Sequence, residues 1–222
     1  MSKHVILIAQ PRSGGVMTSQ LLESKFGYKN RFEYFNTHRY GYDAKFENEL
    51  DAKIHLVDTL RHGDNSIIKV SWFDVCDIFD KLVELEDITW YHLHRTNPTE
   101  MMCSSYMSYL TGIFHVNRGE NIKLVNSVTI PSNFVIDYFD KNNPGGWWYN
   151  CVNNIPIIQT IDCTQITYDD ATTPADMSMT LFGKDYSRAV TATKLYKSKR
   201  SLVTNYTEID NLTRMILKEH PY

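Results

Sequence analysis

The sequence predicts an α/β protein of three layers (α/β/α), in which a central, mostly parallel sheet lies between two layers of helices. Short apolar runs typical of buried parallel strands occupy residues 5–9 and 67–70, and a third strand is predicted over residues 89–94. Segments with helical character separate these runs. Strands that alternate with helices favour a parallel sheet covered on both faces, which leads to this architecture.

The remaining elements follow the same alternation. Residues 27–63 are polar, aromatic and irregular, and they are predicted to form an insertion that shapes an acceptor site over a cleft. No repeat or linker divides the chain, so a single domain over residues 1–222 is predicted. Helices are predicted over 16–26, 73–84, 133–140, 174–182 and 207–219, and a fourth strand within 157–167.

The helix that follows the third strand has clear boundary signals. Asn97 is a favourable N-cap, Pro98 suits the first turn, and Glu100 lies three residues after the cap. The spacing of five further side chains predicts that one face of this helix packs on the core. These side chains are Met102, Tyr106, Tyr109, Leu110 and Ile113.

Composition and charge argue against several classes of protein. The formal net charge of -3, from 23 Lys and Arg against 26 Asp and Glu, gives no support for general binding of nucleic acid. No stretch approaches the ~20 apolar residues that a membrane helix needs, so no membrane insertion is predicted. The four cysteines form no CxxC pair and predict neither a zinc site nor a disulfide framework. A soluble, cytoplasmic protein with reduced cysteines is expected, and no oligomeric state is predicted.

The loop after the first strand carries a candidate anion site. Residues 11–15, Pro-Arg-Ser-Gly-Gly, lie between a buried strand and a helix, a P-loop-like arrangement that presents backbone N–H groups to an anion. The loop lacks the Gly-Lys-Ser/Thr ending of ATP and GTP sites, so a nucleotide-dependent kinase is disfavoured. Arg12 supplies a permanent cation beside the helix N-terminus. The alternative interpretation is a plain strand–helix turn with a surface arginine.

A second candidate anion site follows the third strand. Arg95 stands at the strand end, and Ser104 lies inside the next helix. Because ligands of parallel sheets bind at the carboxyl ends of the strands, the loops after Ala9, Val70 and His94 are expected to converge on one site. Two anion sites at neighbouring strand ends indicate a ligand with two separated anionic groups.

The motifs around these sites resemble those of the sulfotransferases that use 3′-phosphoadenosine 5′-phosphosulfate (PAPS). The loop PRSGGVMTSQLL is similar to their 5′-phosphosulfate loop, and HLHRTNPTEMMCSSY is similar to their 3′-phosphate motif. Matching segments follow in family order over roughly residues 4–212. The resemblance implies PAPS as sulfuryl donor and assigns nine cofactor-binding residues. These are Arg12, Ser13, Gly14, Gly15, Val16, Met17, Thr18, Arg95 and Ser104, with Ser105 as the alternate to Ser104.

Two further segments of the resemblance carry candidate catalytic residues. The segment 31–35 is similar to the Glu-Tyr-Phe segment of the bacterial trehalose 2-sulfotransferase branch, which implies that Glu33 is the catalytic base. The segment 67–71 is similar to the Ile-x-Lys-x-His segment of cytosolic sulfotransferases. It keeps the lysine as Lys69 and has Ser71 where the family has its histidine, which strengthens the case for Glu33. The resemblance also gives Arg12 a catalytic role, in stabilising the charge that develops on the transferred group.

The resemblance implies an enzyme that sulfates a small-molecule or glycan acceptor. The acceptor is expected to be a hydroxyl of a carbohydrate or glycolipid-like molecule, as implied by the likeness around Glu33. Tyr34 and His38 are predicted to bind this acceptor. The name of the acceptor does not follow from these residues.

One departure from the family pattern supports an alternative function. Gly15 and Val16 stand where the family has hydroxyl residues, which removes two side-chain donors to the phosphosulfate. Thr18 is expected to substitute for them, together with backbone N–H groups. The alternative is a PAPS-binding or PAP-binding module of the same fold that has lost its catalysis.

His92 and His94 alternate with Leu93 on the third predicted strand. Two histidines at positions i and i+2 of a strand share a face, which is one pattern of metal ligation. No third ligand accompanies them in the sequence pattern. No metal is therefore predicted, and satisfied or surface histidines are the preferred interpretation.

Overall fold

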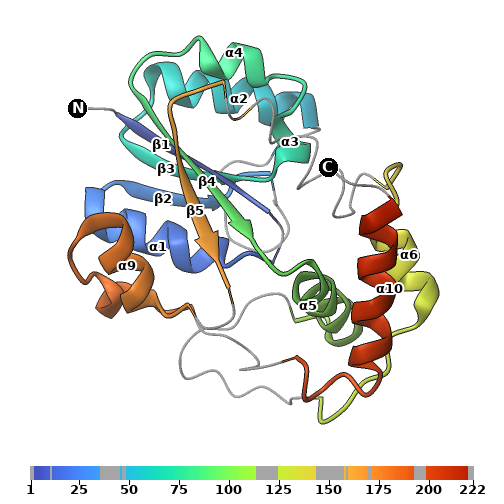
Figure 1. Ribbon diagram of the computed structural model, residues 1–222. Helices are drawn as coiled ribbons and strands as arrows, with labels where there is room; N and C mark the ends of the chain where they lie inside the picture. Colours follow the sequence, from blue (N-terminus) through green and yellow to red (C-terminus); the bar gives the residue numbers. More distant parts are fainter. Residues whose placement is uncertain are drawn as a thin grey trace.

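The computed structural model describes residues 3–10, 12–35, 46, 49–113, 125–143, 158, 160–169, 172–192 and 199–219. Its centre is a five-stranded sheet in which every paired strand is parallel, flanked by helices as an α/β/α arrangement (Figure 1). The predicted fold class is therefore confirmed. The strands are β1 (His4–Ala9), β2 (Lys29–Glu33), β3 (Ser66–Val70), β4 (Ile88–Arg95) and β5 (Cys163–Tyr168).

The strand order β2-β3-β1-β4-β5 places β1 at the centre of the sheet. The chain leaves β1 for the edge strand β2, returns to β3, and then crosses β1 to reach β4 and β5. The register pairs Leu7 with Lys69 and Ala9 with Leu93, so β1, β3 and β4 end side by side. The predicted convergence of the loops that follow these strands is thereby confirmed.

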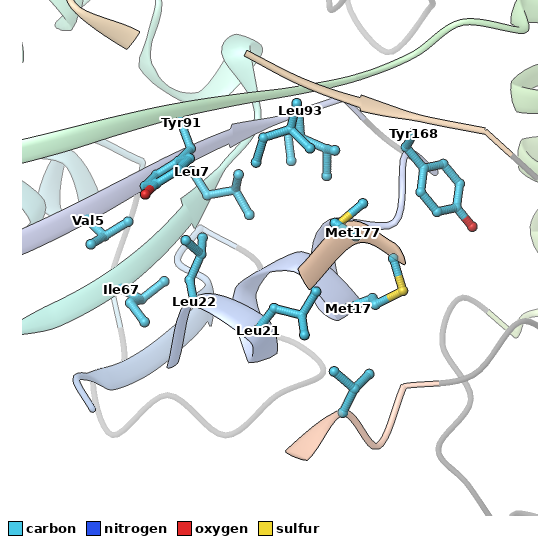
Figure 2. Close-up of a cluster of buried hydrophobic side chains, with 13 residues drawn as sticks. Val5, Leu7, Met17, Leu21, Leu22, Ile67, Tyr91, Leu93, Tyr168 and Met177 are labelled. Carbon is cyan, nitrogen blue, oxygen red and sulfur yellow. The ribbon is translucent and has the colours of Figure 1, made fainter. Parts of the chain in front are cut away.

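Two groups of helices cover the two faces of the sheet (Figure 1). Alternate side chains of β1 supply both cores: Val5 and Leu7 belong to one cluster, Ile6 and Ile8 to the other. Helices α1 (Gly15–Phe26) and α9 (Pro174–Phe182) pack on the first cluster, which Figure 2 shows in close-up. Helices α2 (Glu49–His62), α3 (Trp72–Val75) and α4 (Phe79–Val83) pack on the second.

A third cluster lies beyond the carboxyl ends of the strands. It is built by α5 (Pro98–Thr111), α6 (Ser132–Phe139) and α10 (Tyr206–Glu219), which pack together on one side of the sheet in Figure 1. A parallel bridge between Val128 and Val203 joins the segments that precede α6 and α10. A short 3-10 helix, η1 (Ser187–Ala189), follows α9. Within the described residues, no helix is long and apolar enough to cross a membrane.

The expectation of an irregular insertion over residues 27–63 is wrong for the described part of that stretch. It contains the edge strand β2 and the four-turn helix α2. The sequence of β2, Lys-Asn-Arg-Phe-Glu, lacks an apolar run because an edge strand is not buried like the central ones. In α2 the buried face includes Lys53 and Thr59, which obscures the helical period of the apolar residues.

Two predictions about helices also need correction. The helix expected over 73–84 is divided into α3 and α4 by a turn, in which the Ile78 N–H donates to the Val75 carbonyl. In α5 the predicted apolar face is wrong at its end, because Tyr109 is 76% exposed and Leu110 is 50% exposed. The first half of α5 is instead buried nearly all round, from Thr99 to Ser104, in the cluster that it forms with α6 and α10.

Candidate functional site

The loop after β1 is folded tightly on itself at the carboxyl end of the sheet. Both the N–H and the hydroxyl of Ser13 donate to the carbonyl of Gln10, at 3.2 and 2.6 Å. Arg12 and Gly14 have φ angles of 63° and 83°, in the left-handed region. A non-glycine residue rarely adopts this region, so the loop holds Arg12 in a strained conformation, in which its carbonyl faces Arg95 of β4 and its side chain reaches Ser104.

Side chains from two other strands approach the backbone of both glycines of the loop closely. A Cβ atom at Gly14 would lie 2.8 Å from Cε2 of Tyr168. A Cβ atom at Gly15 would collide with Cε of Lys69. The side chain of Lys69 therefore lies across the first residue of α1. A side chain at position 15 would therefore require the end of the Lys69 side chain to move.

The side chains that follow in α1 are turned into the core. Thr18 is fully buried, and its hydroxyl lies 3.1 Å from the carbonyl of Gly14 and 3.2 Å from Sδ of Met177. The expectation that Thr18 replaces the missing hydroxyl donors is therefore wrong. Met17 is likewise buried, in the cluster of Figure 2. The first N–H groups of a helix have no intrahelical partner, so an anion here would be held by the backbone at Gly15 and Val16.

The end of β4 meets this loop through charged side chains. Nη1 of Arg95 donates to the carbonyl of Arg12 at 3.2 Å. Nε of Arg12 donates to Oγ of Ser104, in α5, at 3.1 Å. Ser104 uses a lone pair in this contact, so its own proton can still be donated to an anion. Ser105 points elsewhere, with its hydroxyl donating to the Met101 carbonyl. Of the two serines, Ser104 therefore lies at the site.

Gln10, which was not predicted as a site residue, joins the loop to the end of β4. Its side-chain Oε1 accepts a hydrogen bond from the backbone N–H of Arg95 at 3.1 Å. The backbone N–H of Gln10 donates to the Leu93 carbonyl at 3.2 Å. Its carbonyl accepts both donors of Ser13. A polar residue that ends a buried apolar strand was the available signal for Gln10.

Tyr168 closes the site from the end of β5. Its ring centroid lies 5.7 Å from Cζ of Arg95, a cation–π contact, and its ring covers Gly14. Figure 2 shows Tyr168 near Met17 and Met177. The motif Ile-Thr-Tyr-Asp-Asp, residues 166–170, was the sequence signal for this tyrosine.

A buried carboxylate balances part of the positive charge. Oε2 of Glu100 lies 3.8 Å from Nη2 of Arg95, and the two side chains are 9% and 1% exposed. Burial, followed by the charge and hydrogen bond of Glu100, raises the pKa of Tyr206. Burial, again followed by the charge of Glu100, raises the pKa of Cys103 to about 12, so this thiol stays protonated and unreactive at neutral pH. Glu100 was expected only as a residue of the helix start.

Glu33, Tyr34 and His38 are the remaining predicted site residues. The backbone register sets Glu33 opposite Lys69, at the carboxyl ends of β2 and β3. The side chain of Glu33 and all of His38 lie outside the described residues. Tyr34 is 2% exposed, and its hydroxyl contacts His55 and Thr59 of α2. The expectation that Tyr34 binds the acceptor is thus not supported by its position in the core.

The assembled site has the geometry of an anion-binding site with two parts. Lys69 and the start of α1 form one part, and Arg12, Arg95 and Ser104 form the other. Both parts lie at the carboxyl ends of adjacent parallel strands, where such sheets bind ligands. Arg12, Lys69 and Arg95 bring three cations to this edge of the sheet, although the whole chain has a net charge of -3, and among the described side chains the carboxylate of Glu100 lies 3.8 Å from Arg95.

Comparison with known proteins adds no relative. The chain matches no protein-family model, and searches of curated proteins and of solved structures find no significant match. The resemblance to sulfotransferases therefore rests on the sequence motifs alone and stays a prediction.

Proposed function

We propose that this protein is a sulfotransferase that moves a sulfuryl group from PAPS to a hydroxyl of a carbohydrate or glycolipid-like acceptor. The observation that carries the proposal is the contact between the two candidate anion sites. Arg12 and Ser104 are 92 positions apart in the sequence, yet their side chains share a hydrogen bond of 3.1 Å. Arg95 joins the same group through the Arg12 carbonyl. A ligand with two anionic ends would engage both segments at once.

Two groups of residues would bind the two anionic groups of PAPS. Backbone N–H groups at Gly15 and Val16, with Lys69 beside them, suit a sulfate or phosphate group at the start of α1. Arg95 and Ser104 suit a second phosphate, because a guanidinium and a hydroxyl can donate to the same anion. The ring of Tyr168 lies over Gly14 and supplies an apolar surface between the two positions. These donors match the 5′-phosphosulfate and the 3′-phosphate of PAPS.

When bound, PAPS supplies an activated sulfuryl group whose bond to the phosphate oxygen breaks as the acceptor oxygen attacks sulfur. Glu33 would accept the proton of the acceptor hydroxyl. Lys69 and Arg12 would stabilise the negative charge that develops on the departing phosphate and on the sulfonate oxygens. Positioning and charge stabilisation are the main contributions of a protein to such group transfers. The register of β2 and β3, which pairs Glu33 with Lys69, is consistent with these roles.

A binding module without catalysis is the second candidate function. It is favoured by Gly15, where a hydroxyl residue is replaced and the Lys69 side chain fills the space. It is also favoured by the inward orientation of Thr18, which leaves backbone N–H groups as the donors of the α1 start. A module of this kind would bind PAPS or its product PAP without turnover.

The first experiment is a calorimetric titration with 3′-phosphoadenosine 5′-phosphate (PAP), the product that keeps both anionic groups. We expect PAP to bind more tightly than 5′-AMP, because AMP lacks the group that Arg95 and Ser104 would hold. Ser104→Ala should weaken PAP binding by about tenfold or more, because a hydrogen bond to a charged group contributes roughly 1.5–3 kcal/mol. Ser105→Ala is the matched control and should bind PAP as the wild type does.

Turnover separates the two candidate functions. With PAPS and a panel of carbohydrate acceptors, Glu33→Gln should bind PAP normally and lose about 10²–10⁴-fold in rate, the contribution of a general base. PAP binding without transfer to any acceptor would favour the binding module. Equal affinity of the folded wild type for PAP and 5′-AMP, or no affinity for either, would refute both candidates.

A further inference from the structure

His92 and His94 lie on the face of β4 opposite to Arg95. They are separated by Leu93, so their side chains share one face, and their ring centroids are 5.6 Å apart. Trp90 precedes them on this face and belongs to the cluster under α2, α3 and α4. The two imidazoles therefore lie outside the candidate anion site, with the sheet between them and Arg95.

Each imidazole is held by the residue directly across from it on β5, the strand beside β4 in Figure 1. Nδ1 of His92 lies 2.7 Å from Oε1 of Gln165, and Nε2 of His94 lies 3.3 Å from Oγ1 of Thr167. An amide oxygen only accepts hydrogen bonds, so Nδ1 of His92 carries the proton and Nε2 keeps its lone pair. The β5 side chains thus set the orientation of both rings.

The other nitrogen of each ring is buried and forms no hydrogen bond within the described part of the chain. Nε2 of His92 and Nδ1 of His94 have no hydrogen-bond partner among the described residues. His92 is only 3% exposed, so its ring is closed off from bulk solvent. A buried polar atom without a partner costs roughly 1–3 kcal/mol, and native proteins contain few of them. Two such atoms on adjacent rings are not explained by the packing of the sheet.

We propose that His92 and His94 form a binding site for a divalent transition-metal ion of the Zn²⁺, Ni²⁺ or Cu²⁺ class. Neutral imidazole is a preferred ligand of these ions. With metal–nitrogen bonds of about 2.0–2.1 Å, a tetrahedral ion holds two imidazole centres about 5 Å apart, close to the observed separation. Gln165 acts as the outer partner that fixes the ring of His92, as the partners of metal-ligating histidines do.

The site has two ligands from the described part of the chain. No group of three or more His, Cys, Asp or Glu side chains suited to a metal occurs among these residues. The remaining positions around the ion would be filled by water or by an external ligand. The proposal does not depend on PAPS, because neither histidine contacts the anion-binding residues in any described hydrogen bond or ring contact.

The test uses the full chain, purified without metal, and titrated with ZnCl₂ in a calorimeter. Wild type should bind one equivalent. His92→Gln and His94→Gln should each weaken that binding by about tenfold or more, and Gln165→Leu by about tenfold, as loss of an outer partner does. His62→Gln, at an exposed histidine of α2, is the matched control and should bind as the wild type does.

A second measurement covers the case in which a buried variant fails to fold. Copper(II) added at one equivalent to the wild type should give an electron paramagnetic resonance spectrum with hyperfine structure from two imidazole nitrogens. Fewer than two coupled nitrogens would overturn the proposal. Equal Zn²⁺ affinity of folded His92→Gln, His94→Gln and wild type would overturn it as well, since the binding would then be adventitious.

Discussion

The loop after β1 and the end of β4 lie side by side at the same edge of the sheet, but they contribute to the site in different ways. In the loop after β1, Ser13 and Thr18 turn their hydroxyls back to carbonyls of the same segment. At the end of β4, Arg95 extends its side chain to the neighbouring loop, and Ser104 receives the side chain of Arg12. Apart from Arg12, whose side chain reaches Ser104, the first region therefore offers mainly backbone, and the second offers side chains.

This difference predicts how each region responds to substitution. A region that acts through its backbone tolerates loss of a hydroxyl but not a change at a glycine whose φ is positive. A region that acts through buried charge tolerates conservative backbone change but not loss of one partner of a charged pair. The predictions below test this division, in order of the expected effect.

Arg95→Met should have the largest effect on stability. It leaves the buried carboxylate of Glu100 without the guanidinium that lies 3.8 Å away, where the side chains are 1% and 9% exposed. Breaking a buried ion pair costs about 3–5 kcal/mol, as measured by urea unfolding. The double variant Arg95→Met/Glu100→Gln should recover part of that loss, because the side chain that loses its guanidinium is then neutral. Strictly additive losses in the double-mutant cycle would contradict a coupled pair.

Gly14→Ala should have the next largest effect on stability. Its φ of 83° is strained for alanine, at about 1–2 kcal/mol, and the new Cβ would lie 2.8 Å from Tyr168. Overpacking adds about 1–3 kcal/mol, so we expect a loss of about 3 kcal/mol in thermal or urea unfolding. Gly27→Ala is the matched control at the other end of α1, since it has a φ of 69° and nothing within 4 Å. Equal losses in the two variants would show that the contact with Tyr168 is unimportant.

The pH dependence of stability should arise largely from β4. Burial, only partly offset by the hydrogen bond to Gln165, lowers the pKa of His92 from 6.5 to about 4, and burial also lowers the pKa of His94. The unfolded chain therefore binds protons that the folded chain does not, so stability is full above pH 6.5 and falls as the pH drops toward 4. At pH 5 the loss from His92 should be about 2 kcal/mol.

His92→Gln tests this assignment by removing the titrating group. The free energy of unfolding of this variant should change less between pH 7.5 and 5 than that of the wild type, in metal-free buffer. Burial also lowers the pKa of His4 at the start of β1, so a smaller pH dependence remains in the variant. An unchanged pH dependence would place the response outside β4.

Much of the sheet could be predicted from local sequence, and one strand could not. The strands β1 and β3 could be predicted from their apolar runs because a central parallel strand is buried on both faces, and β4 was predicted as a third strand. The strand β2 has a polar sequence and exists through its pairing with β3, which is a long-range interaction. The same holds for the buried first half of α5, whose environment is set by α6 and α10.

The candidate site shows the same limit at the level of single residues. The positions of Arg12, Arg95 and Ser104 were predicted from strand ends and motifs, and the structure brings them together. The orientation of Thr18 was not predictable, because it depends on Met177 of α9. The role of Gln10 was not predicted for a similar reason, because it arises from a hydrogen bond with the backbone N–H of Arg95 on the neighbouring strand.

The sequence by itself determined the α/β class, the alternation of strands and helices along the chain, and the strand ends at which cationic residues lie. These properties depend on local hydrophobicity, on capping residues and on the positions of glycines, all of which are set by residues close together in the sequence. Only the tertiary structure decided which side chains face one another: Lys69 across Gly15, Tyr168 over Gly14, and the two imidazoles of β4 against β5. Those contacts join residues up to 154 positions apart, from Gly14 to Tyr168. They depend on strand order and register, which no local pattern encodes.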